Sequence, residues 1–193
     1  MMEFVYAYAY FILYAFLGWV CEDLYCGIPA KKFINRGFFY GPYCPIYGVG
    51  ALLVLYPLLF VKDYPILVFI LGVIITSTLE YITSWVMEIL FKTRWWDYSK
   101  RFMNINGRVC LLNSTLFGIM SIVVVYIVHP VIQDIVTDIP LTALMSFLSA
   151  FTIGFGIDCV FTVLALLRRK QVFQKVQTQM EAFKKDFEAE SQL

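Results

Sequence analysis

Apolar residues gather in five long stretches that are separated by shorter polar segments. The stretches run over Phe4–Cys26, Pro45–Val61, Pro65–Phe91, Val109–His129 and Leu141–Leu167. A helix needs about 20 apolar residues to cross a bilayer, and lipid offers no hydrogen-bonding partner to an open backbone. We therefore predict an all-α polytopic membrane helix bundle with five transmembrane helices. Prolines mark the expected segment edges, where a missing N–H costs least, at Pro65, Pro130 and Pro140.

Lysine and arginine are concentrated in alternate loops. The first and third loops are basic, as is the segment after the fifth stretch, whereas the second loop has only Lys62 with Asp63 and the fourth has no Lys or Arg. Cytoplasmic loops of membrane proteins carry an excess of Lys and Arg. We therefore expect the N-terminus outside, the C-terminus inside, and a multi-pass protein of the cytoplasmic membrane.

The chain becomes polar after Leu167, and its pattern changes. Hydrophobic residues recur there at three- and four-residue spacing, at Val172, Val176, Met180, Phe183 and Phe187. This stripe predicts an amphipathic helix that lies on the membrane or on a partner. We accordingly divide the chain into a transmembrane domain, residues 1–168, and a cytoplasmic amphipathic helix, residues 169–193, with the fifth span at 141–167.

Composition narrows the class of protein. The chain is 61% hydrophobic with a mean hydropathy of +0.75, which is too apolar for a soluble domain of 193 residues. A net charge of +1 gives no basic signal for nucleic acid. The five cysteines form no CxxC pair and there is one histidine, so we expect no metal site and no cofactor.

Two stretches of the chain resemble each other in order and spacing. Trp19-Val20-Cys21-Glu22 is similar to Trp85-Val86-Met87-Glu88, 66 positions later, and the same shift takes Gly41 to Gly107 and Cys44 to Cys110. We predict an internal repeat of two helix-loop-helix units, at about residues 4–61 and 65–129. Since each unit has two crossings, the copies are parallel and related by an axis along the membrane normal.

Five acids lie within the apolar stretches. Glu80 and Asp158 fall deep inside theirs, and Glu22, Asp23 and Glu88 fall nearer the cytoplasmic ends. An intramembrane acid is costly, so it usually faces the bundle interior or a wet cavity and has a partner. Arginine forks onto carboxylates and stays charged when buried, so the natural partners come from the basic loops: Arg36, Arg94 and Arg108.

These residues allow two interpretations, which the sequence leaves open. One is a polar cavity, open to the cytoplasm, that binds a small polar ligand; the other is a set of buried ion pairs that fix helix packing. For Trp95 alone an ordinary interfacial position is the better explanation, and we expect His129 to be interfacial too. The candidate ligand-binding residues are Glu22, Arg36, Glu80, Glu88, Arg94, Trp95, Asp97, Asn106, Arg108, Asn113 and Asp158.

Motifs of three enzyme classes are missing from the sequence. It contains no GxxxxGK[ST] loop, no HExxH and no GxSxG, so we expect no ATPase, protease or hydrolase activity and assign no catalytic residue. An enzyme built on this chain would have to use its acids and arginines, for example Glu88 or Asp97 on a lipid headgroup.

A set of motifs together resembles a known family. They are Asn35-Arg36-Gly37-Phe38, Gly41-Pro42, Pro45-Ile46-Tyr47-Gly48, Leu79-Glu80-Tyr81, Arg94-Trp95-Trp96-Asp97-Tyr98-Ser99 and Asn106-Gly107-Arg108-Val109-Cys110. The combination, over about Tyr8 to Pro130, resembles the ABC-transporter type IV (CmpB-like) membrane family of Gram-positive bacteria. The resemblance implies a permease of the bacterial cytoplasmic membrane that works with a separate ATPase subunit.

Three functional hypotheses follow. The first is a transporter or permease subunit whose polar site takes a small polar solute, an ion or a lipid headgroup, working in the lipid bilayer as a homo-oligomer or with an ATPase. The second is a membrane enzyme acting on lipid or cell-wall intermediates. The third is a membrane scaffold that recruits a partner by its C-terminal helix.

Overall fold

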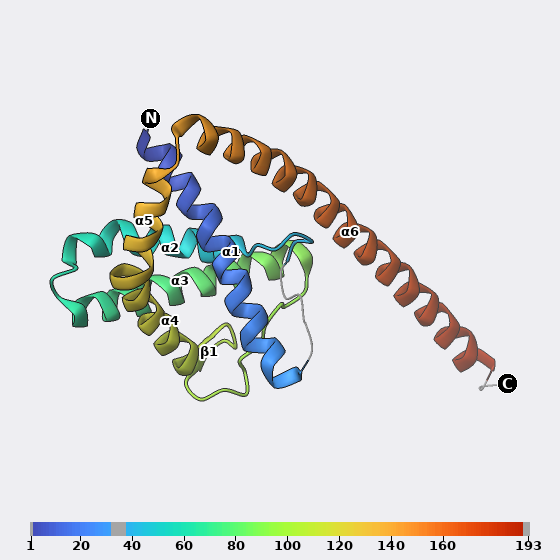
Figure 1. Ribbon diagram of the computed structural model, residues 1–193. Helices are drawn as coiled ribbons and strands as arrows, with labels where there is room; N and C mark the ends of the chain where they lie inside the picture. The colour runs from blue at the N-terminus through green and yellow to red at the C-terminus, as the bar shows by residue number, and fades with distance from the viewer. Residues whose placement is uncertain (1, 32–37, 191–193) are drawn as a thin grey trace.

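The computed structural model describes residues 2–31 and 38–190, and for residues 29–30, 169–178 and 181–190 it describes the backbone alone. Helices dominate the described chain (Figure 1). The elements, in order, are α1 (Met2–Ala30), α2 (Pro45–Leu58), the 3-10 turn η1 (Leu59–Val61), α3 (Pro65–Phe91), β1 (Asn104–Ile105), β2 (Val109–Cys110), α4 (Leu111–Val123), the π-helical turn η2 (Val124–Val128), α5 (His129–Asp138) and α6 (Leu141–Glu190).

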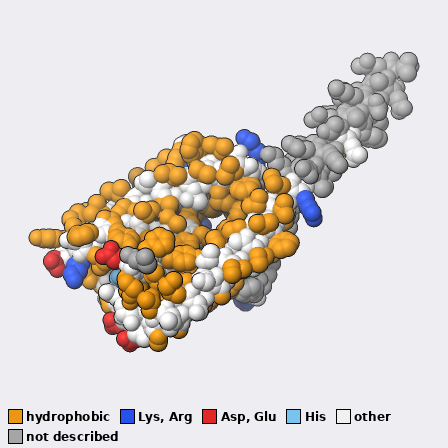
Figure 2. Space-filling model, turned by 90° about the horizontal axis from the view of Figure 1, so that it is seen from above, with side chains coloured by type: hydrophobic (Ala, Val, Ile, Leu, Met, Phe, Trp, Pro, Cys, Tyr) orange, Lys and Arg blue, Asp and Glu red, His pale blue; other side chains and the backbone are white. Residues whose placement is uncertain are grey.

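The described helices suit a membrane in length and in surface. Four segments are long and apolar enough to cross one: Met2–Ile28, Pro65–Phe91, Leu111–Asp138 and Leu141–Arg168. Hydrophobic side chains dominate the face seen in Figure 2, an arrangement that a soluble protein avoids. The chain is therefore a multi-pass, all-α membrane protein. Pro45–Val61 is apolar but shorter, so the prediction of a fifth crossing stays a prediction.

The helix that begins at Leu111 does not end at Pro130, and our placement of a segment edge there is wrong. Proline lacks an N–H, and in an α-helix its ring clashes with the carbonyl four residues earlier. Here the preceding turn is π-helical, with the His129 N–H donating to the Val124 carbonyl five residues back. This wider turn accommodates the proline, so the helix continues to Asp138.

α1 packs on α2 and α3 packs on α4, and the hydrophobic core lies where these pairs meet. A Cβ added to Gly48 of α2 would collide with the backbone carbonyl of Phe11, so glycine permits this close approach. His129 is buried beside α1, and its expected position at the membrane interface stays a prediction. It shares a hydrogen bond of 3.2 Å with the Tyr14 hydroxyl and meets the Tyr10 ring edge to face.

α6 is one unbroken helix that leaves the bundle at an angle and carries the C-terminal end of the chain away from it (Figure 1). Little of its apolar segment is buried. Its contacts include Phe151 and Phe155, whose rings pack against Tyr43 of the loop between α1 and α2. The helix passes residue 168 without a break, and the division into a membrane part and a cytoplasmic part stays a prediction.

Candidate functional site

A β-hairpin carries the polar residues of the loop between α3 and α4. α3 ends at Phe91, and Lys92, which follows it, has the left-handed backbone (φ 56°) that commonly caps the end of a helix. The chain then returns through β1 (Asn104–Ile105) and β2 (Val109–Cys110), which pair antiparallel. Asn106 and Gly107 both have positive φ, 52° and 68°, as in the type I′ turn that Asn-Gly favours. The turn chemistry thus fixes how the loop folds back over α3.

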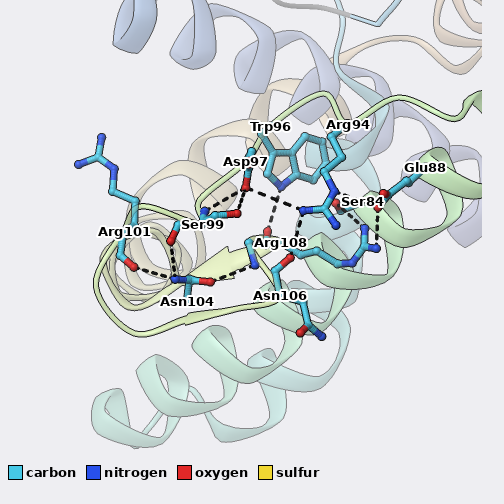
Figure 3. Close-up of polar contacts among 11 residues, drawn as sticks. Ser84, Glu88, Arg94, Trp96, Asp97, Ser99, Arg101, Asn104, Asn106 and Arg108 are labelled. Atoms are coloured by element: carbon cyan, nitrogen blue, oxygen red, sulfur yellow. Dashed lines mark hydrogen bonds and ion pairs between the residues drawn. The ribbon is translucent and has the colours of Figure 1, made fainter.

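Two arginines converge on one carboxylate oxygen of Glu88 (Figure 3). The Arg108 Nη2 lies 2.6 Å from Glu88 Oε2, and the Arg94 Nε donates to the same oxygen at 3.1 Å. The other terminal nitrogen of Arg108 donates to the Ser84 hydroxyl at 3.2 Å, and its guanidinium lies 5.7 Å from the centre of the Tyr81 ring. The two cations neutralise Glu88 and tie the hairpin to α3.

Asp97 and Asn106 are also held by hydrogen bonds near this cluster (Figure 3). Asp97 Oδ1 accepts both the hydroxyl and the backbone N–H of Ser99, and these bonds, with the nearby Arg94, hold the pKa of Asp97 below its ordinary value. The Asn106 amide donates to the Tyr81 hydroxyl at 2.9 Å. Asp97 and Asn106 therefore help to shape the loop.

The neighbouring tryptophans have different surroundings. The Trp96 indole N–H donates to the Arg108 carbonyl at 2.9 Å, which ties the loop to the hairpin. Trp95 instead packs its ring against Phe38 and Phe91, with centroid distances of 5.5 and 5.4 Å. Trp95 is therefore part of an aromatic cluster rather than of the polar site.

Glu80 lies two turns before Glu88 on α3 and has a different environment. Its side chain is buried, with only 6% of the residue exposed. One carboxylate oxygen, Oε1, accepts the Tyr98 hydroxyl at 3.2 Å, and that hydroxyl accepts the Asn113 amide at 2.6 Å. The other oxygen, Oε2, has no hydrogen-bond partner among the described residues. Burial and the negative charge of Glu80 raise the pKa of Tyr98, so this phenol stays protonated and donates.

Glu22 of α1 lies near this group. Its Oε2 accepts the Tyr47 hydroxyl of α2 at 2.7 Å, and its Oε1 lies 3.9 Å from the Cys26 sulfur. The charge of Glu22 acts on both Glu80 and Tyr98. We call Glu22, Tyr47, Glu80, Tyr98 and Asn113 the acid–tyrosine cluster.

Asp158 of α6 lies in a third environment. Its carboxylate accepts the backbone N–H groups of Tyr40 and Gly41 at 3.2 and 2.8 Å, the Tyr43 hydroxyl, and the Thr162 hydroxyl at 3.0 Å. Burial, and then the bond to Asp158, raise the pKa of Tyr43. Asp158 is thus well provided with donors and fastens α6 to the loop between α1 and α2.

The structure brings the predicted site residues together in separate groups. The ion-pair cluster consists of Glu88, Arg94, Asn106 and Arg108, with Asp97 at its edge. The acid–tyrosine cluster includes Glu22, Glu80 and Asn113. Asp158 and Trp95 belong to neither cluster, because Asp158 is hydrogen-bonded to the loop between α1 and α2 and Trp95 packs on aromatic rings. We expected arginines as partners of the intramembrane acids. Among the described residues this holds for Glu88 but is wrong for Glu80, Asp158 and Glu22, because hydroxyl and backbone donors take that place. Arg36 lies outside the described residues.

The site predicted from the sequence did not include three tyrosines that contact its acids, namely Tyr43, Tyr47 and Tyr98. Each donates its hydroxyl to one of the acids, and each is counted as apolar by hydropathy. The acids could have predicted these tyrosines, because a buried carboxylate needs hydrogen-bond donors and a phenol in an apolar setting also needs a partner.

Comparison with known proteins gives one match. The model of a family described as Putative ABC-transporter type IV matches residues 9–163, most of the chain. No curated protein and no solved structure matches the chain.

Proposed function

This chain belongs to the Putative ABC-transporter type IV family, and from that premise we propose that it is the membrane-spanning permease subunit of an ABC-type transporter. Its apolar helices form the path through the bilayer, and the polar residues between α3, the hairpin and α1 recognise a small polar solute, an ion or a lipid headgroup. The N-terminus lies outside and the C-terminus inside, with five crossings.

The observation that carries the proposal is the burial of Glu80 in an apolar helix. An acid inside a membrane helix is costly and is found chiefly on substrate or ion pathways. The ion-pair cluster differs, because Glu88 shares two arginines and is neutralised by them. We therefore assign recognition to the acid–tyrosine cluster. The ion-pair cluster holds the hairpin, whose Gly107 carbonyl in turn accepts the backbone N–H of Tyr98.

The same contrast weighs against the enzyme hypothesis. That hypothesis would use Glu88 or Asp97 as an acid or base, yet Glu88 is engaged by two arginines and Asp97 by two donors of Ser99. A group so engaged is a poor proton carrier at neutral pH. Transport is therefore the function that the geometry favours.

Packing supports the further proposal that α1–α2 and α3–α4 are parallel repeats. Gly48 of α2 packs against Phe11 of α1. A shift of 66 positions takes this pair to Ser77 and Ser114, whose hydroxyls share a hydrogen bond of 2.7 Å between α3 and α4. The two helix pairs thus meet at equivalent positions, as a duplicated unit would.

A genetic experiment tests the transport role. The chromosomal gene of the source organism is replaced by Glu80→Gln, by Asp138→Asn, or by a deletion, and the solute, ion and lipid contents of the cells are compared. Asp138 is the matched control, because it is an exposed acid at the end of α5. We expect Glu80→Gln to reproduce the changes of the deletion and Asp138→Asn to match the wild type. A deletion without any change in content, or a Glu80→Gln strain that behaves as wild type, would refute the proposal.

The ATPase partner needs a separate test. The tagged chain is purified in mild detergent from the membranes of the same organism, and ATP hydrolysis and the accompanying subunits are measured. We expect a subunit with a GxxxxGK[ST] loop to accompany the chain and vanadate-sensitive hydrolysis to follow it. Failure of both would leave the chain without the motor that an ABC-type permease requires.

A further inference from the structure

The acids of the described chain differ in how many positive charges and hydrogen-bond donors their carboxylates contact. Glu88 has two arginines, and Asp158 has four donors. Glu22 accepts one hydroxyl and has a thiol nearby. Glu80 combines burial, an ionisable carboxyl and an oxygen, Oε2, without a hydrogen-bond partner among the described residues.

No positive side chain compensates Glu80 within the described residues. The ion pairs there number three, and all of them join Arg94 or Arg108 to Glu88 or Asp97. The charge that acts on Glu80 comes instead from a second acid, Glu22. The cluster therefore concentrates negative charge in a buried place.

Neither protonation state of Glu80 is completed by the described groups. An ionised Oε2 would lack a donor, and a protonated Oε2 would lack an acceptor, because no hydrogen-bond partner among the described residues lies within reach. A buried polar atom without a partner destabilises the folded protein. A bound cation removes the repulsion from Glu22, and a metal ion also supplies the partner that Oε2 lacks.

The remaining members of the cluster supply neutral oxygens. Tyr98 donates its hydrogen to Glu80 Oε1, so its hydroxyl oxygen offers a lone pair that the Asn113 amide already uses in part. The titratable groups that face the site come from four elements: Glu22 from α1, Tyr47 from α2, Tyr98 from the loop, and Cys110 from β2. Each of these groups is neutral when protonated and negative when it loses its proton, so none of them would attract an anion.

We propose that Glu80, assisted by Glu22 and the hydroxyl of Tyr98, binds a monovalent cation, an alkali-metal ion or a proton. One carboxylate with a neutral oxygen donor suits a single charge, and hard cations prefer oxygen ligands. This inference rests on the proposed function, because it names the class of ligand for the Glu80 part of that site. It gives the transporter a cation as cargo or as a companion of its solute.

The test uses the full-length chain purified in lipid nanodiscs. Sodium chloride or potassium chloride replaces N-methylglucamine chloride at constant ionic strength, and thermal unfolding and infrared difference spectra of the carboxyl groups are recorded. In a second arm the pH is raised in N-methylglucamine chloride alone. Asp138→Asn is again the control and should respond as the wild type does.

For an alkali-metal ion we expect a saturable rise in Tm with one of the two salts and a change in a carboxylate band, both absent in Glu80→Gln. For a proton we expect no response to the salts and a carboxylic-acid band that disappears as pH rises, again absent in Glu80→Gln. If Glu80→Gln does not fold, Tyr98→Phe serves instead and should change the apparent affinity about threefold to tenfold, the effect of one hydrogen bond.

The inference is overturned if the wild type responds in neither arm, if Glu80→Gln keeps the response, or if Tyr98→Phe, when it stands in, binds as the wild type does. Binding by the isolated chain needs no ATPase and no transport. If the wild-type chain binds no cation but deletion of the gene changes the solute, ion or lipid content of the cells, only this inference is refuted. If the chain binds a cation but the deletion changes nothing, only the proposed function is refuted.

Discussion

Gly107 is the residue on which the shape of the hairpin depends most directly. Its φ of 68° lies in the left-handed region, where an alanine costs about 1–2 kcal/mol relative to the right-handed region. An added Cβ would also lie 2.5 Å from both Asp97 Oδ1 and Ser99 Oγ, the ends of two exposed side chains that are hydrogen-bonded to each other. Relieving the overlap requires these side chains to move apart, and the loss of that hydrogen bond costs about 0.5–1.5 kcal/mol.

We therefore expect Gly107→Ala to lower the free energy of unfolding by about 2 kcal/mol, after an opposing gain of about 0.4–1 kcal/mol from the restricted unfolded chain. The Gly107 carbonyl accepts the Tyr98 N–H at 2.7 Å, so the hairpin amides should also exchange their hydrogens faster. Reversible unfolding by SDS in mixed micelles, followed by tryptophan fluorescence, measures the first effect, and hydrogen exchange with mass spectrometry measures the second.

Gly154 of α6 provides the matched control. No atom lies within 4 Å of a Cβ added there, and its backbone is helical. Gly154→Ala should therefore be neutral or stabilising by about 0.5–1 kcal/mol. If Gly107→Ala costs less than about 1 kcal/mol, or if the two variants are indistinguishable, then neither the left-handed turn nor its contact with Asp97 shapes the hairpin.

Two further predictions concern the charged groups of the loop. Arg108→Ala should lower Tm by about 5 °C and loosen the hairpin, because it removes bonds to Glu88 and Ser84. The control is Arg101→Ala, which changes an exposed residue of the same loop and should alter Tm little. Equal shifts of Tm for the two variants in differential scanning fluorimetry would show that the ion pair does not hold the hairpin. The pKa of Asp97 is lowered in the folded protein, so its contribution to stability is present above the unfolded pKa and is lost as pH falls through the folded value. Asp97→Asn should flatten this acid limb of the stability curve below about pH 4, and an unchanged limb would contradict the assignment.

Hydropathy alone located the membrane helices well, because the length and composition of a span are local properties. Of the five predicted spans, four correspond to helices apolar and long enough to cross a membrane. The prediction failed at Pro130, because a π-helical turn just before it can absorb a proline, and nothing local in Val124–Val128 announces that turn.

The polar contacts were harder to predict, because they depend on how a loop folds back. Tyr98 reaches Glu80 from 18 residues away only because the hairpin returns over α3. The rule that acids pair with arginines was correct for Glu88, where the chain had both arginines within reach, and it failed for Asp158, where backbone N–H groups serve instead. Residue types indicated which side chains are costly to bury, but the partners follow from tertiary geometry.

The attachment of α6 has a mechanical consequence. A continuous helix is stiff, and the part of α6 beyond Asp158 is roughly 48 Å long at 1.5 Å per residue. With the carboxylate of Asp158 bonded to Tyr40 and Gly41, the helix acts as a lever whose fulcrum is that loop. A force applied near its far end is thereby delivered as torque to the junction of α1 and α2, with no need for a contact between the two places.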